Sequence, residues 1–170
     1  MKILYKQTSS RDFEKFPDRW YQLLCQELQN EFGDEASEIY DILPYEGIVG
    51  PVAGNYLQAT AITLAGKVRF TKRWFKYYDT DERHAFEILA HEAYHVYDQP
   101  HDKKRFVIDW LAPYIATSII SYLSVAVRKL KIPTFNEVRA GIPQETMAEA
   151  FAARVMDVIE ADPANPFVRR

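Results

Sequence analysis

Cysteine is almost absent from the chain, which has a single one among 170 residues. One cysteine cannot form an internal disulfide, so a reducing compartment suits the chain and we expect a cytoplasmic location. Cys25 follows Leu23 and Leu24, where a small buried apolar side chain accounts for it. The first ten residues, MKILYKQTSS, contain only three consecutive apolar residues, too few for the core of a signal peptide.

The sequence also lacks a strong charge of either sign, since its formal net charge is −3. This small negative charge provides no general attraction to nucleic acid or to an anionic membrane. One stretch, RFTKRWFKYY at 69–78, does interleave aromatic and basic residues in a way that suits stacking on bases. We expect a strand end and a loop here, whose aromatic side chains pack on the core while the charges stay in water, and we do not expect a nucleic-acid partner.

Long hydrophobic runs are limited to one, WLAPYIATSIISYLSVAV at 110–127, between KKR and RKLK. Its length lies at the lower limit for a membrane span, and Pro113, two tyrosines and several hydroxyls interrupt it. We therefore predict a buried helix that crosses the centre of the domain, and we do not expect a membrane partner. Anchoring of the protein in a membrane by this run is the open alternative.

The fold prediction follows from composition and periodicity. A chain of 170 residues that is 48% hydrophobic, without internal repeats, indicates one domain over 1–170. Helices are predicted at 18–32, from about 82 to 97 with a capping box of Asp79 and Glu82, over roughly 104–130, and from Pro143 onward. Strands are predicted within QATAITLAGKVRF, and 34–57 mainly as loop. The expected fold class is α+β, with a small, mostly antiparallel sheet packed on several helices.

The motif HEAYH at 91–95 is the main indication of chemistry. Residues four apart on a helix share a face, so His91 and His95 can direct their imidazoles to one metal ion. Zinc accepts such a pair, and Glu92 is placed to take a proton from a zinc-bound water. The pattern lies on a predicted helix, which is the context that the motif requires.

The third ligand is open at this point. His101 has the third-histidine spacing of the metzincin pattern, but Asp98 stands in place of that pattern's glycine and no Met-turn follows. A glutamate on a later helix is the other source. PQETMAEAFAARVMDVIE offers Glu145 on one face with Ala148, Ala152, Val155 and Ile159. Glu149, one turn later, could accept a hydrogen bond from the ring of a ligand histidine.

These segments together resemble the gluzincin metallopeptidases, particularly minimal ones. AITLAGKVRF resembles the edge strand above their cleft, HEAYH their active-site helix, and PQETMAEAFA their glutamate helix. The resemblance covers about residues 58–156 and implies a zincin-like metallopeptidase core. It implies His91, His95 and Glu145 as zinc ligands, Glu92 as general base and Glu149 as the acid that supports a histidine. The usual acid there is Asp, and Glu137 in NEVRA is a second candidate ligand.

The resemblance implies a zinc-dependent metallopeptidase that hydrolyses peptide bonds, with Glu92 activating a zinc-bound water and a peptide or protein as substrate. The alternative is a metal-binding regulatory or interaction domain that keeps the peptidase fold without turnover. The sequence does not determine the substrate sequence, the oligomeric state or the residue that would stabilise an oxyanion.

Overall fold

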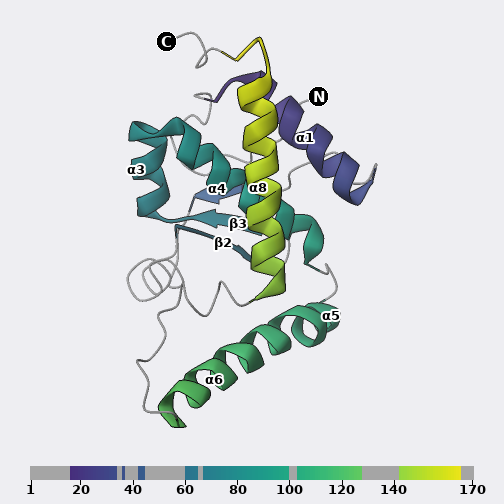
Figure 1. Ribbon diagram of the computed structural model, residues 1–170, viewed down its shortest axis with the longest axis vertical. Coiled ribbons are helices and arrows are strands. Elements are labelled where there is room, and N and C mark those ends of the chain that lie inside the picture. Colours follow the sequence, from purple (N-terminus) through teal and green to yellow (C-terminus); the bar gives the residue numbers. More distant parts are fainter. Residues whose placement is uncertain are drawn as a thin grey trace.

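The structure is a computed structural model that describes residues 16–33, 36, 42–44, 60–64, 67–99, 103–127 and 142–165. Figure 1 shows its helices around one small sheet, with one long helix below them. The helices are α1 (Asp18–Phe32), α3 (Lys72–Thr80), α4 (Glu82–Asp98), α5 (Lys103–Arg105), the π-helical segment η2 (Phe106–Leu111), α6 (Ala112–Val127) and α8 (Pro143–Ala161). The strands are β1 (Ile42–Pro44), β2 (Ala61–Leu64) and β3 (Lys67–Phe70).

The predicted α+β fold with a mostly antiparallel sheet is wrong, because helices dominate the described part of the chain. The three strands have only three or four residues each, whereas α4 and α8 have 17 and 19. The strand order is β1-β3-β2, and β3 pairs antiparallel with β2 but parallel with β1. Runs of β-branched residues this short support only a minimal sheet, so long amphipathic helices supply most of the core.

Helix α4 lies at the centre of the domain and contacts α8, α3, α1 and the strands β2 and β3 (Figure 1). From Ala85 to Val96, every residue except Glu87 and Ile88 is buried. A helix that is buried on nearly every side can carry polar groups only where each of them has a partner. The buried polar residues in the second half of α4 are therefore candidates for a functional role.

The last helix, α8, begins as the sequence predicts, with Pro143 in its first turn. The predicted face is the one that packs inward, because Glu145, Ala148, Ala152, Val155 and Ile159 are all buried. Ion pairs on the outer side connect α8 to its neighbours. Arg83 of α4 contacts Glu160 at 2.6 Å, and Arg154 contacts Glu31 of α1 at 2.6 Å.

Helix α1 also follows the prediction. It buries one apolar face, which includes Trp20, Leu24 and Leu28, against the core. It ends before Gly33, whose φ of 86° lies in the left-handed region that favours glycine. Cys25 is buried in this helix, and burial raises the pKa of its thiol.

The basic and aromatic stretch at 69–78 forms the end of β3 and most of α3, so the expected loop is a helix. Three of its aromatic side chains are buried: Phe70 stacks on Trp74 with ring centroids 3.9 Å apart, and Trp74 stacks on Tyr78. Trp74 Nε1 donates a hydrogen bond to the carbonyl oxygen of Ala85, 2.9 Å away. Arg73 and Lys76 are exposed. This aromatic cluster fixes α3 against the start of α4.

The cap of α4 differs from the predicted one. Asp81 is the N-cap residue, and its carboxylate accepts a hydrogen bond from the backbone N–H of His84 at 3.0 Å. Asp79 belongs to α3 instead. The sequence has acids at 79, 81 and 82, and the cap depends on where α3 ends, which the acids alone do not reveal.

The apolar run at 110–127 is the clearest departure from expectation. It does not cross the domain centre, because α4 occupies that place, and α5, η2 and α6 form one long helix below the other elements (Figure 1). Eight large hydrophobic side chains of this long helix are exposed, six of them within 110–127, and Ile120 is 64% exposed. The prediction of a buried central helix is therefore wrong. No described helix is both long enough and apolar enough to cross a membrane.

Candidate metal centre

His91 and His95 converge on one point, as the spacing of HEAYH predicts. They lie on adjacent turns of α4, both are buried, and their Nε2 atoms are 3.2 Å apart. The two rings are nearly perpendicular, with an interplanar angle of 80°. Two imidazole nitrogens that face one another so closely in the interior require a proton or a cation between or beside them.

Glu145 completes the cluster from the first turn of α8, about fifty residues later in the chain. Its Oε2 lies 3.3 Å from His91 Nε2, and its Oε1 lies 3.7 Å from His95 Nε2. Glu145 is buried, and burial of a carboxylate without a positive partner is strongly unfavourable. The alanines of this face, Ala148 and Ala152, are also buried, and their small side chains suit the close packing of α8 on α4.

These separations fit a metal ion. Zinc with tetrahedral bonds of about 2.0–2.1 Å places its ligand atoms about 3.3–3.4 Å from one another. The three separations here are 3.2, 3.3 and 3.7 Å. Within the described residues, His91, His95 and Glu145 form a group that could hold a metal ion, and all three are buried. Among the described residues, these two imidazoles and one carboxylate would leave the fourth tetrahedral position of a zinc ion for water or substrate, an arrangement typical of catalytic zinc sites.

The negative charge around the histidines also favours a cation. Burial disfavours the charged form of His95, but the hydrogen bond to Glu145 and the charges of Glu92, Glu145 and Asp98 outweigh burial and raise the pKa of His95. Without a metal, these carboxylates favour the protonated, positively charged form of His95. A divalent ion would replace that proton and supply a larger charge.

Glu92 is oriented by the sheet rather than by the other helices. Its side chain is buried, and the hydroxyl of Thr63 donates a hydrogen bond to Glu92 Oε2 at 2.6 Å. Thr63 lies on β2, and its carbonyl oxygen accepts a hydrogen bond from Gln99 Nε2 at 3.0 Å. Strand β2 is thereby connected to α4 at Glu92 and at Gln99, the C-cap residue of this helix.

Among the remaining candidates, Glu149 is exposed on α8, whereas Glu145 one turn earlier is buried. An exposed carboxylate is poorly placed to orient a buried histidine, so the role expected for Glu149 is not supported. Besides Glu92, Asp98 acts on His95 by its charge from the same helix, and burial raises the pKa of Asp98 against the effect of His95. His101 and Glu137, the other two candidate ligands, lie outside the described residues.

Sequence reasoning missed Thr63, Gln99 and Asp98 as neighbours of the site. The sequence predicts Thr63 on a strand, on the side that it shares with Ala61 and opposite to Thr60, Ile62 and Leu64. Both Ala61 and Thr63 are buried, and a hydroxyl on the buried side of a strand signals that a polar partner is needed. That signal identifies the side of the strand but not its partner, because the contact spans 29 residues of sequence.

Comparison with known proteins adds no relative: no protein-family model matches the chain, and no curated protein or solved structure matches it either.

Proposed function

We propose that the chain is a zinc-dependent hydrolase of peptide bonds, of the gluzincin type that its motifs resemble. The observation that carries the proposal is the buried cluster of His91, His95 and Glu145, whose ligand atoms lie 3.2–3.7 Å apart next to a fixed Glu92. A purely structural zinc site is usually closed by four protein ligands. A three-residue site with an adjacent carboxylate is what a hydrolase needs.

The chemistry divides between the ion and the chain. A zinc ion held there would act as a Lewis acid on the scissile carbonyl and on a water molecule. Glu92 takes the proton from the attacking water through its oxygen that Thr63 does not engage. It then passes that proton to the leaving amine nitrogen as the C–N bond breaks. Burial of both histidines and of Glu92 keeps bulk water away from these groups.

The position of β2 favours a peptide as the substrate. In the described part of the sheet, β2 pairs with β3 on one side and lies at the sheet edge on the other. An extended peptide can add to such an edge through backbone hydrogen bonds. Because Thr63 on β2 contacts Glu92, a peptide paired with this edge would run beside the general base.

Thr63 is a positioning residue in this proposal, and Thr63→Val tests that role. Valine keeps the shape of the buried side chain but removes the hydroxyl that holds Glu92. We expect kcat to fall about tenfold, as for other groups that orient catalytic residues, while KM and zinc content stay unchanged. Thr63→Ser retains the hydroxyl and should restore most of kcat. Equal kcat in the wild type and Thr63→Val, or equal loss in both variants, would contradict this role.

The proposed activity is tested by incubating the zinc-loaded protein with a broad peptide library and identifying new termini by mass spectrometry. We expect cleavage that a chelator abolishes and that added zinc restores. Absence of cleavage by protein that holds one zinc per chain would contradict the hydrolase proposal. It would favour a metal-stabilised binding domain in its place.

A further inference from the structure

The helix formed by α5, η2 and α6 exposes apolar side chains where a helix in water normally exposes polar ones. On α6, Ile119 is 52% exposed and Leu123 is 59% exposed, and both lie one turn apart on the same face. Thr117, Ser118 and Ser121 lie on the other face and are the less exposed residues. The apolar side chains of α6 are therefore the ones that face water, which is the reverse of the arrangement usual for a helix at a protein surface. The exposed apolar face consists of Ile115, Ile119, Ile120, Leu123 and Val127.

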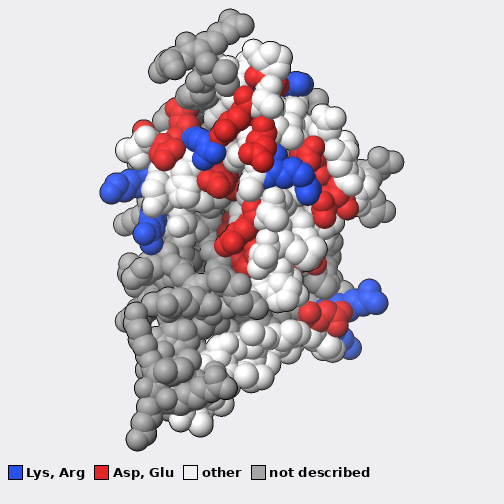
Figure 2. Space-filling view, in the orientation of Figure 1, with Lys and Arg blue, Asp and Glu red and all other residues white. Residues whose placement is uncertain are grey.

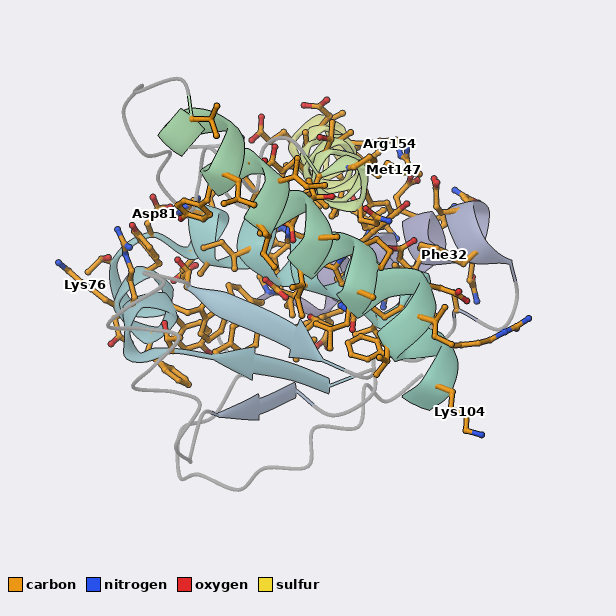
Figure 3. All side chains as sticks on the ribbon, turned by 90° about the horizontal axis from the view of Figure 1, so that it is seen from below. Phe32, Lys76, Asp81, Lys104, Met147 and Arg154 are labelled. Atoms are coloured by element: carbon orange, nitrogen blue, oxygen red, sulfur yellow. The ribbon has the colours of Figure 1, made fainter. Side chains whose placement is uncertain are left out.

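The charges of this segment lie at its two ends. No Asp, Glu, Lys or Arg occurs over 110–127, and Figure 2 shows most of the lower helix without charged atoms. Lys103, Lys104 and Arg105 precede the apolar run, and Arg128, Lys129 and Lys131 follow it in the sequence. From 103 to 131 there are six cations and one acid, Asp109, although the whole chain has a net charge of −3. Lys104 extends outward from the α5 end of the helix (Figure 3).

We propose that the apolar face of α6 binds an anionic lipid surface, with the helix lying in the plane of that surface. An apolar face of this kind sits at the boundary between headgroups and acyl chains, and flanking lysines and arginines reach the phosphates. The local positive charge complements anionic headgroups. This proposal concerns a surface that the metal centre does not use, and it stands whether or not the protein is a peptidase.

A second copy of the chain is the competing occupant of this face. Paired helices of soluble proteins typically bury a narrow apolar stripe that is flanked by charged residues, which set partner and register. Here the exposed apolar side chains include two adjacent residues, Ile119 and Ile120, and they continue along the helix to Leu123 and Val127. Charged flanking positions are absent from 110–127. A broad apolar face between two cationic ends fits a lipid surface better than a specific helical partner.

The test is flotation of the full-length protein with vesicles of phosphatidylcholine and phosphatidylglycerol in equal parts. The wild type should float with these vesicles, and its binding should weaken as salt rises. The double variant Ile119→Ser, Leu123→Ser should bind at least tenfold more weakly, because two apolar side chains no longer enter the lipid. Lys104→Ala with Arg105→Ala should weaken binding and reduce its dependence on salt.

Met147→Ser is the matched control, because Met147 is 51% exposed but lies on α8 rather than on the lower helix (Figure 3). It should float like the wild type, and the far-ultraviolet circular dichroism of all variants should agree. Failure of the wild type to float, or equal flotation of the double variant, would overturn the proposal. A dimer in the absence of vesicles that the double variant dissociates would assign this face to a second copy instead, and would also overturn it.

Discussion

Glu92→Gln is expected to reduce peptide hydrolysis by at least about 100-fold while one zinc ion per chain is retained. General-base catalysis contributes roughly 10²–10⁴ in rate, and a neutral amide cannot accept the proton. Glutamine keeps the size of the side chain, and its carbonyl oxygen can still accept the hydrogen bond from Thr63. The fold and the metal ligands therefore stay in place. Steady-state kinetics and zinc content by mass spectrometry measure the two quantities separately.

The matched control for this variant is Glu87→Gln, a glutamate on α4 that contacts Arg83 and His84 rather than the histidine pair. It should keep the rate of the wild type. Full activity in Glu92→Gln would remove Glu92 from the mechanism. Loss of zinc together with loss of activity would show that Glu92 supports the metal site and would leave its role as a base without support.

Glu145→Ala is expected to weaken zinc binding by more than about 100-fold, the upper range found when groups around metal ligands are removed. The substitution deletes the proposed ligand from α8, and it also removes a carboxylate that helps to raise the pKa of His95. Competition with a chromogenic chelator measures the affinity. Zinc should raise the Tm of the wild type, because it binds only the folded protein, and should leave the Tm of Glu145→Ala nearly unchanged.

Glu149→Ala provides the control, since it makes the same change one turn later on the same helix. Glu149 is exposed, so zinc affinity and the rise in Tm should match those of the wild type. If both variants bind zinc as tightly as the wild type, Glu145 is not a ligand. If Glu149→Ala loses zinc and Glu145→Ala does not, the carboxylate that α8 supplies to the metal is Glu149 and not Glu145.

The parts of this site that the sequence predicts are the ones fixed by helical periodicity. The four-residue spacing of His91 and His95 and the apolar face that Glu145 shares with Ala148 each depend on a single helix. Local pattern is sufficient there, because one turn of helix brings both side chains to the same face. The meeting of the two helices was inferred from resemblance, and the structure brings Glu145 to the histidines at 3.3 and 3.7 Å.

The parts that the sequence did not predict depend on contacts between distant segments. The parallel pairing of β1 with β3 joins Ile42 to Val68, and β1 lies in a region that reads as loop. The hydrogen bond from Thr63 to Glu92 requires β2 to lie against α4, which no local pattern encodes. The exposed position of α6 was missed for a related reason. An apolar run predicts burial but does not reveal which surface covers it.

The measurement that tests the metal centre most directly is an anomalous-difference map collected at the zinc absorption edge on crystals grown with zinc. We predict one strong peak per chain within bonding distance of His91 Nε2, His95 Nε2 and a carboxylate oxygen of Glu145. A map without a peak there, or a peak bound by other side chains while Glu145 lies apart, would contradict it.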